Sequence, residues 1–278
     1  MVPNMVGARG RLGQDDSASW TSNEIDGEEW IGIATHETMK LSIAMPAFNE
    51  VATLAAAVDR VLLVDYPCPV ELVIVDDGST DGTAALIESF SDERIVRIAH
   101  PQNRGKGAAI RTAAQAATGD FLIICDADLE YEPSEIPSLV APVLAGHAEL
   151  VYGTRTFGSH TAFSFWYVMG NKTVTMAANV LFDAWISDLE TCFKLLPLDV
   201  YRQLEVRSEG FGMEAEVTGK LLKTGFRPYE VPISYQARSR AAGKKLTWRD
   251  GVEALWILLR LRLTYRPPAD LKARASRR

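Results

Sequence analysis

The first half of the chain alternates short apolar runs with stretches suited to helices. The apolar runs are LSIAMP at 41–46, VELVIVD at 70–76, IVRIA at 95–99 and FLIICD at 121–126. Helices are expected after Asn49, after Asp81 and from Gly105. Near-continuous apolar strands separated by helices indicate a parallel sheet that is buried on both faces. The pattern therefore predicts an α/β fold.

The alternation continues beyond residue 149 with more varied elements. Further strands are predicted in ELVYGTR at 149–155, around TCFKLLP at 191–197 and in RPYEVPISY at 227–235. Helices are predicted from Met213 to Lys223 and near Val252 to Leu263, and an aromatic stretch extends from Phe163 to Trp185. The main α/β domain is thus expected at 39–235, followed by a basic loop and an amphipathic helix at 236–278.

Residues 1–38 differ from the rest of the chain. They mix Gly, Ser, Asp and Glu without an apolar period, which predicts a disordered extension. A translation start at Met39, where MKLSIAMPAFNE begins, would leave this extension out of the native protein.

Polar loops follow three of the predicted strands. They read DDGSTDGT after the second strand, HPQNRGKGAA after the third and DADLEYEP after the fourth. In open α/β sheets, ligands bind beyond the carboxyl ends of the strands. The three loops are therefore expected to form one ligand site.

The D-A-D sequence of Asp126, Ala127 and Asp128 is the strongest local signal of chemistry. Two carboxylates one residue apart at a strand end can reach one hard cation, and Mg²⁺ or Mn²⁺ prefers such oxygens together with substrate phosphates. A metal bound there would neutralise a leaving diphosphate. A polar strand terminus is the simpler alternative.

The other two loops suit a nucleotide. Asp76 and Asp77 end a strand, where a carboxylate can accept hydrogen bonds from a base N–H or a ribose hydroxyl; the alternative is a plain Asp-Gly turn. Lys106 stands between two glycines at a helix N-terminus, which favours a nucleotide or phosphate, with tight helix packing and a solvated lysine as the alternative. The absence of a Walker loop and of a full dinucleotide fingerprint argues against an ATPase or a dehydrogenase.

Five motifs resemble, in order and spacing, the inverting family 2 glycosyltransferases of the GT-A fold. They are MPAFNE, VDDGST, NRGKGAAIRTA, GDFLIICDADLEYEP and VYGTR, and the similarity extends through DLETCFKLLP and RSRAAGKKLTWRDG to cover about residues 40–263. Within that family the chain looks most like dolichyl-phosphate mannose synthases and bacterial polyprenyl-phosphate glycosyltransferases. The resemblance implies a Rossmann-like, mostly parallel central sheet flanked by helices in a single catalytic domain.

The resemblance also implies roles for the residues that match. The residues implied to line the nucleotide pocket are Pro46, Ala47, Asn49 and Glu50, and Asp77 is implied to contact the nucleobase. Asp126 and Asp128 would hold the metal and the diphosphate, and Glu130, where many of these synthases have Gln, could be a third metal ligand. Arg155 matches an arginine associated with phosphate binding, and Asp188 matches an acid near the sugar. Lys172 and Lys194 are secondary candidates for the acceptor phosphate.

The net charge of −7 hides a strong asymmetry. Residues 1–38 carry seven acids against two bases, whereas residues 234–278 carry twelve bases against three acids. This favours a local anionic partner, such as a phosphate or an acidic lipid surface, over nucleic acid. Four of these basic residues are predicted to form a loop that closes over the diphosphate, with a solvated patch as the alternative: Arg238, Arg240, Lys244 and Lys245.

Other features bear on location. The three cysteines include no C-x-x-C pair, which argues against a disulfide framework and a zinc site. No run is apolar enough to span a bilayer, so any membrane anchor is expected to be a separate protein. The aromatic residues of 163–185, with Trp248, Trp256 and the interleaved arginines, fit either a buried core or a helix face on acidic lipid. We expect a cytoplasmic protein, peripheral on the cytoplasmic face of the membrane.

Together these features predict a metal-dependent hexosyltransferase. It would transfer a sugar from a nucleotide-diphosphate sugar, of the GDP-mannose or UDP-glucose type, to a polyprenyl or dolichyl phosphate with inversion. A phosphate acceptor is already anionic and needs no strong base, whereas a hydroxyl acceptor would make Asp188 the general base. Two alternatives stay open: a family 2 glycosyltransferase with a soluble acceptor, such as a saccharide or a phosphoglycerate, and a catalytically silent nucleotide-binding scaffold at the membrane.

Overall fold

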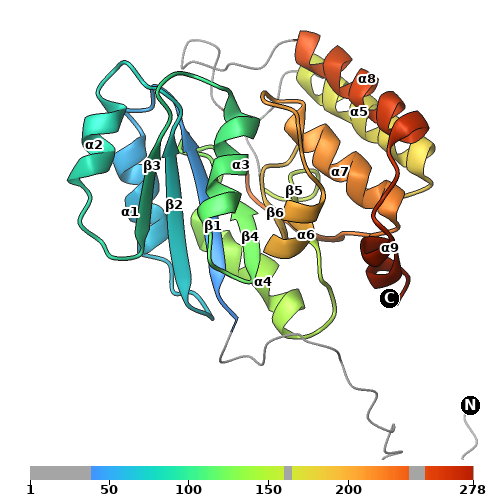
Figure 1. The fold of residues 1–278 in the computed structure, drawn as a ribbon, viewed down its shortest axis with the longest axis horizontal. Helices are drawn as coiled ribbons and strands as arrows, with labels where there is room; N and C mark the ends of the chain where they lie inside the picture. The colour runs from blue at the N-terminus through green and yellow to red at the C-terminus, as the bar shows by residue number, and fades with distance from the viewer. Residues whose placement is uncertain (1–38, 160–164, 238–247, 278) are drawn as a thin grey trace, which may run out of the picture. The chain divides into compact units, whose positions relative to one another are not determined.

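A seven-stranded sheet forms the centre of the fold in the computed structural model of the protein (Figure 1). The structure describes residues 39–159, 165–237 and 248–277, so the predicted extension at 1–38 and the four basic residues Arg238, Arg240, Lys244 and Lys245 lie outside it. The strands are β1 (Leu41–Ala47), β2 (Val70–Asp76), β3 (Ile95–Ala99), β4 (Phe121–Ile124), β5 (Val151–Thr154), β6 (Lys194–Pro197) and β7 (Tyr229–Pro232). Their order across the sheet is β3-β2-β1-β4-β6-β5-β7.

The sheet is mostly parallel, as the apolar strands predicted. Strand β1 pairs in parallel with β2 and β4, β2 pairs in parallel with β3, and β5 pairs in parallel with β7. Among the described strands, β6 alone runs antiparallel to its neighbours β4 and β5. The residues that precede β6 therefore lie beyond the carboxyl end of β4, beside the D-A-D sequence.

Helices cover both faces of the sheet. They are α1 (Leu54–Leu62), α2 (Thr83–Ser89), α3 (Lys106–Ala116), α4 (Ile136–Leu144), α5 (Phe165–Phe182), α6 (Leu198–Gln203), α7 (Met213–Thr224), α8 (Trp248–Thr264) and α9 (Ala269–Ser276), with a short 3-10 helix at Pro133–Glu135. One apolar cluster joins α1 and α4 to one sheet face, and a second joins α3, α6, α7 and α9 to the other. This double burial explains why the strands are apolar at almost every position.

The alternation of side chains along β2 decides where its last residues point. Ile74 belongs to the cluster on the α1 side, whereas Val73 and Val75 belong to the cluster on the α3 side. Successive side chains of a strand point to opposite faces. Asp76 therefore points to the α1 and α2 side, and Asp77 to the side of α3.

A third apolar cluster extends the fold beyond the sheet. It joins α5 and α8 to α7, and Figure 1 shows these two helices side by side on the outer side of α7. Leu271 of α9 is buried in the cluster of α3 and α7. The described residues from 39 onward thus belong to one compact unit. None of the helices in the described part of the chain is long and apolar enough to cross a membrane.

Candidate active site

Asp77 ties the loop after β2 to the loop after β3. Its carboxylate accepts hydrogen bonds from the backbone N–H groups of Arg104 (3.0 Å) and Gly105 (2.7 Å), and lies 2.7 Å from Nδ1 of His100. Only 2% of Asp77 is exposed. The carboxylate therefore shapes the turn that leads into α3. His100 was not singled out from the sequence, although it follows β3 directly at the ligand edge of the sheet.

Lys106 ties the loop after β3 to the D-A-D sequence after β4. Its Nζ lies 2.8 Å from Oδ2 of Asp126 and 2.9 Å from Oε1 of Glu214, which belongs to α7. It also lies 3.1 Å from Sγ of Cys192, whose thiol is 2.8 Å from the same Asp126 oxygen. The three polar loops thus meet at one place, as the sequence predicted.

The charges around Lys106 are largely shielded from solvent: 13% of the Lys106 side chain, 17% of the Asp126 side chain and 5% of the Glu214 side chain are exposed. Burial alone would lower the pKa of Lys106, but the neighbouring Asp126 and Glu214 carboxylates raise that pKa well above its ordinary value. Oε2 of Glu214 is buried without a hydrogen-bond partner. Lys106 therefore stays a cation and holds Asp126 in place. No local pattern marked Glu214, because its contact with Lys106 spans the chain from α3 to α7.

The D-A-D carboxylates offer two oxygen donors, whereas the Glu130 carboxylate is hydrogen-bonded elsewhere. Asp126 and Asp128 are partly exposed, and Oδ1 of Asp128 accepts the backbone N–H of Glu130 at 3.0 Å. The Glu130 carboxylate is buried and accepts the Tyr235 hydroxyl. No group of three His, Cys, Asp or Glu side chains in the described ranges is arranged to hold a metal. Two carboxylates completed by substrate phosphate oxygens suit Mg²⁺ or Mn²⁺, whereas the geometry gives no support to Glu130 as a third ligand.

The loop after β1 packs against the loop after β2. The Ala47 carbonyl accepts the Asp77 N–H at 2.8 Å, and the Asn49 side chain accepts the Thr80 N–H at 2.8 Å. Asn49 has φ 55°, a left-handed conformation that Asn tolerates better than most residues. The Glu50 N–H donates to Thr83 at 2.9 Å. The segment 46–50 therefore lies beside Asp76 and Asp77, as a shared nucleotide pocket would require.

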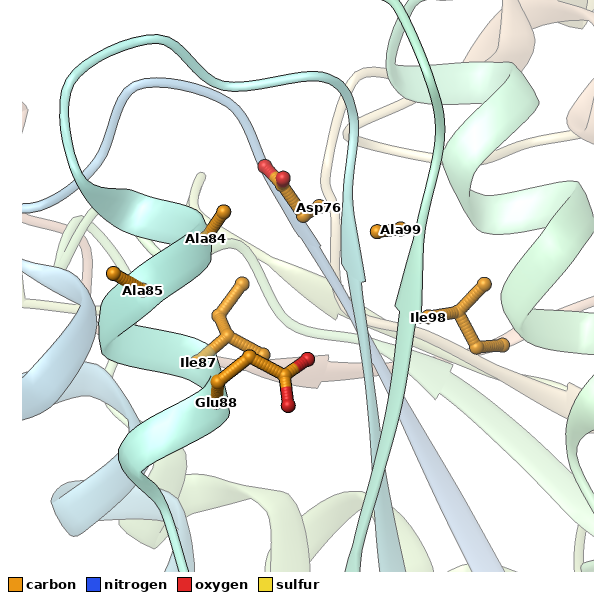
Figure 2. A pocket seen from close by; sticks show the side chains of 7 residues that line it. All are labelled: Asp76, Ala84, Ala85, Ile87, Glu88, Ile98 and Ala99. Carbon is orange, nitrogen blue, oxygen red and sulfur yellow. The ribbon is translucent and has the colours of Figure 1, made fainter.

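Asp76 lines a separate small cavity between α2 and the strands β2 and β3 (Figure 2). The cavity has a volume of about 180 Å³, and its lining residues are Asp76, Ala84, Ala85, Ile87, Glu88, Ile98 and Ala99. The Asp76 carboxylate accepts the Ser79 N–H at 3.1 Å. The side chains of the two adjacent aspartates thus point to different sides of the sheet, and only Asp77 points to the side of Lys106.

Arg155 and Asp188 form a buried ion pair beyond β5. Nε and Nη2 of Arg155 lie 2.7 Å and 2.8 Å from the two Asp188 oxygens, and Asn171 of α5 donates to the same carboxylate at 2.8 Å. Only 1% of Asp188 is exposed. Burial alone would raise the pKa of Asp188, but the Arg155 charge and the hydrogen bonds lower it below its ordinary value. Asp188 is therefore a clamp for Arg155 and a poor proton acceptor.

Glu190 and Lys194 occupy the segment that leads into β6. Lys194 is fully buried and its ammonium donates to the carbonyls of Leu189 (2.8 Å) and Thr191, so it is not accessible to an acceptor phosphate. The partly buried Glu190 makes no hydrogen bond or ion pair within the described residues. Burial and the charge of Glu214 raise the pKa of Glu190 to about 7. Glu190 lies two residues before Cys192, which contacts Asp126. The family resemblance implied a role for Asp188 in this segment but none for Glu190.

The segment that precedes the basic loop lies against the D-A-D loop. The Gln236 N–H donates to the Glu130 carbonyl at 2.9 Å, and the ring of Tyr235 packs against Tyr131. The Arg155 guanidinium lies 4.9 Å from the centre of the Tyr235 ring. The chain thus leaves the described residues beside Asp128 and Arg155.

Comparison with known proteins gives several relatives. The hexosyltransferase Agl6 of low-salt glycan biosynthesis in Haloferax volcanii is 28% identical over 210 residues, which cover 73% of this chain and 49% of the relative. The polyprenol monophosphomannose synthase of Mycolicibacterium smegmatis is 28% identical over 219 residues, or 74% of this chain and 81% of the relative. The undecaprenyl-phosphate 4-deoxy-4-formamido-L-arabinose transferase of Proteus mirabilis is 36% identical over 121 residues, or 42% of this chain and 36% of the relative. The chain thus spans about half the length of the first relative.

The solved structures agree on the fold. Glucosyl-3-phosphoglycerate synthase of Mycobacterium tuberculosis superposes with a TM-score of 0.60 at 21% identity, and the match covers 81% of each chain. The family described as glycosyl transferase family 2 matches residues 42–204, which is more than half of the sequence and includes the loops that meet at Lys106. The chain therefore belongs to glycosyl transferase family 2.

Proposed function

We propose that the protein transfers a sugar from a nucleotide-diphosphate sugar to a polyprenyl phosphate. The observation that carries the proposal is the contact of Lys106 with Asp126 at the sheet edge, because a cation that could bind a phosphate then lies beside two carboxylates that could hold a metal. The names of two relatives specify polyprenol and undecaprenyl phosphate, which supports the class of acceptor.

The donor would lie across the three loops. The segment 46–50 with Asp77 would bind the nucleoside, and Lys106 would bind the diphosphate. Asp126 and Asp128 would hold Mg²⁺ or Mn²⁺ together with that diphosphate, and the ion would supply the positive charge that stabilises the leaving group. A solved glucosyl-3-phosphoglycerate synthase structure contains Mn²⁺ and UDP, which supports a divalent ion in this fold.

The acceptor would approach from the side of Arg155. Its phosphate oxygen forms the new bond to the anomeric carbon while the bond from that carbon to the diphosphate breaks, and the nucleoside diphosphate leaves with the electron pair. Attack from the opposite side inverts the configuration. No proton has to be removed from a phosphate acceptor, which agrees with an Asp188 that is committed to Arg155. Arg238, Arg240, Lys244 and Lys245 are proposed to close over the diphosphate.

A soluble hydroxyl acceptor is the second candidate. Glu190 favours it, because a carboxyl without a partner and with a pKa raised to about 7 suits a general base. The glucosyl-3-phosphoglycerate synthases share the fold. A lipid-linked acceptor would instead require the protein to work at a membrane surface, peripherally or with a separate anchor protein.

Two measurements test the proposed function. Thermal unfolding with Mn²⁺ and either GDP-mannose, UDP-glucose or UDP-N-acetylglucosamine identifies the donor, because a ligand that binds the folded state raises its stability. Transfer of labelled sugar is then compared between a short-chain prenyl phosphate and 3-phosphoglycerate. We expect product with the prenyl phosphate, loss of product in Asp128→Asn, and no loss in Asp59→Asn, which changes an exposed carboxylate of α1. Product with 3-phosphoglycerate alone would contradict the proposed acceptor.

A further inference from the structure

Helix α8 carries two apolar faces, only one of which is covered. Ala254, Ile257, Leu258 and Leu261 are buried against α5 and α7. Residues on the other side are exposed at a spacing of three and four, which places them on one face of a helix: Trp248, Val252, Trp256, Leu259 and Leu263. Trp248 is 76% exposed and Leu263 is 74% exposed. An amphipathic helix of a globular protein needs only the first of these two faces.

Helix α5, which packs against α8, also has one buried and one exposed apolar face. Val174, Ala178 and Phe182 are buried in the cluster shared with α7 and α8. The exposed side again follows the helical period: Trp166, Met169, Met176 and Val180. Trp166 is 78% exposed and Val180 is 75% exposed. We call the exposed apolar residues of both helices the α5/α8 face.

The charges around this face are mainly positive. Arg249, Arg260 and Arg262 of α8 and Lys172 of α5 are exposed. The exposed acid Glu253 lies toward α7, because its carboxylate is 3.3 Å from the position that a Cβ on Gly212 would take. Asp250 lies in the first turn of α8, away from Arg260 and Arg262. Large apolar side chains interleaved with arginines match the interface of an acidic bilayer, where the apolar parts enter the lipid and the cations meet the headgroups.

The α5/α8 face is also connected to the site. Asn171, on α5 between Trp166 and Met176, donates to Asp188, which clamps Arg155. Helix α7 packs against α5 and α8 and carries Glu214, the partner of Lys106. A surface held at this face would therefore lie next to the helix that borders Arg155. This is where a phosphate whose chain remains in a membrane would arrive.

We propose that the α5/α8 face docks the protein on the surface of an anionic lipid bilayer. The proposal rests on the proposed function, since a polyprenyl phosphate is presented at such a surface. The exposed side chains of the α5/α8 face, including Trp166 and Trp256, enter the bilayer at the level of the headgroups. Asn171 connects this face, through Asp188, to Arg155, on whose side the acceptor phosphate would approach.

Vesicle co-sedimentation of the full chain, without donor or acceptor, tests the docking surface. We expect binding to vesicles that contain phosphatidylglycerol and weak binding to phosphatidylcholine alone, with the difference reduced at high salt. The double variant Trp166→Ser/Trp256→Ser should lower the binding constant at least about tenfold. Arg260→Glu/Arg262→Glu should abolish the preference for anionic lipid. The matched control is Leu63→Ser, which removes an apolar side chain that is 85% exposed at the end of α1.

Thermal unfolding shows whether each variant is folded, and we expect little change because the substituted side chains are exposed. Equal vesicle binding by the wild type and the tryptophan variant would overturn the proposal, as would the absence of wild-type binding. A wild-type dimer that the tryptophan variant disrupts, without vesicle binding, would assign the face to a second copy of the chain instead. Transfer to a short, water-soluble prenyl phosphate should be the same in the wild type and the tryptophan variant. If the wild type itself does not transfer sugar to this soluble prenyl phosphate, the proposed function is contradicted, whereas the result of the vesicle experiment still stands.

Discussion

Arg155 is oriented by Asp188, and this pairing changes what a substitution at Asp188 can report. If Asp188 were the general base for a hydroxyl acceptor, Asp188→Asn would abolish transfer to a hydroxyl acceptor and spare transfer to a phosphate acceptor. In the structure the carboxylate accepts Arg155 and Asn171 while it is almost fully buried. Loss of its charge leaves the Arg155 cation without a carboxylate partner, so activity should fall with either class of acceptor.

Asp188→Asn is predicted to destabilise the fold at neutral pH by about 3 kcal/mol, the usual cost of breaking a buried ion pair from one side. The lowered pKa of Asp188 sets the direction with pH: its contribution is present above the pKa of an unfolded aspartate and is lost as the pH falls through the folded pKa. Urea unfolding of the wild type and the variant should thus give a gap that narrows in acid. Asp59→Asn is the control, and a gap independent of pH would contradict the ion pair.

Glu190 should show the opposite dependence on pH. Its folded pKa of about 7 lies above the ordinary value of 4.5, so the fold favours the protonated carboxyl. Stability is present below the unfolded pKa and is lost as the pH rises through about 7. Glu190→Gln, which cannot ionise, should unfold at a higher temperature than the wild type at pH above about 8 and at a similar temperature near pH 4. A lower melting temperature of the variant at both pH values would show that Glu190 is paired.

Single residues differ in how far the sequence could predict them. Asp126, Asp128 and Lys106 stand directly at strand or helix ends, and the parallel sheet brings such ends together. Glu214 lies inside a helical pattern, and its burial next to Lys106 depends on how α7 packs on α3. Glu130 is a residue for which sequence spacing alone is not enough. Its spacing from Asp128 suits a metal ligand, but in the structure its carboxylate accepts the Tyr235 hydroxyl.

At the scale of elements, the N-terminus of α3 is fixed by backbone contacts that leave no room for a side chain. The Gly107 N–H donates to the Glu209 carbonyl at 2.7 Å, and a Cβ on Gly107 would lie 2.2 Å from the Ser208 oxygen. The Gly-Lys-Gly sequence thus serves close packing as well as the display of Lys106. The close packing that the sequence offered as an alternative is confirmed, but Lys106 is not solvated, because Asp126 and Glu214 hold its ammonium. Binding of a nucleotide or phosphate at this helix end stays a prediction.

Gly107→Ala separates these contacts from helix propensity. Propensity alone would stabilise α3 by about 1 kcal/mol, but the clash with backbone atoms should dominate and destabilise the protein by about 2 kcal/mol. Because Lys106 moves with the helix end, sugar transfer should fall by more than the loss of folded protein explains. Gly210→Ala is the matched control, since a Cβ there meets nothing within 4 Å. Equal melting temperatures for the two variants would refute the close approach.

The elements that the sequence predicted well are those with strong periodic patterns. The predicted ranges of strands β1 to β4 and the predicted start of helix α3 agree with the structure to within a few residues. Helix α4 has no clear helical pattern in the sequence, because Pro137 and Pro142 interrupt it. The antiparallel direction of β6 carries no local signal, since an apolar strand looks alike in either direction. That direction is what brings Cys192 to Asp126 and so decides part of the site.

At the scale of the whole molecule, the site already contains a cation of its own, Lys106. Lys106 forms ion pairs with Asp126 and Glu214, and within the described residues no group of three His, Cys, Asp or Glu side chains is arranged to hold a metal ion. A divalent ion therefore has to compete with Lys106 and obtain further oxygens from the donor. The family resemblance alone predicted carboxylates near a metal, but it did not predict this competition.

Metal and nucleotide should consequently bind cooperatively. We predict that Mn²⁺ alone and UDP or GDP alone each raise the melting temperature slightly, and that the correct pair raises it by more than the sum, by several degrees for about 3 kcal/mol of binding linkage. Because coupling is reciprocal, the nucleotide should tighten Mn²⁺ binding by the same factor as the ion tightens nucleotide binding, which calorimetry can measure in both directions. Asp128→Asn should remove the coupling and leave weak nucleotide binding, whereas Asp59→Asn should keep it. A full thermal shift with Mn²⁺ alone would mean that the protein supplies a complete metal site, and the two-carboxylate arrangement would then be wrong.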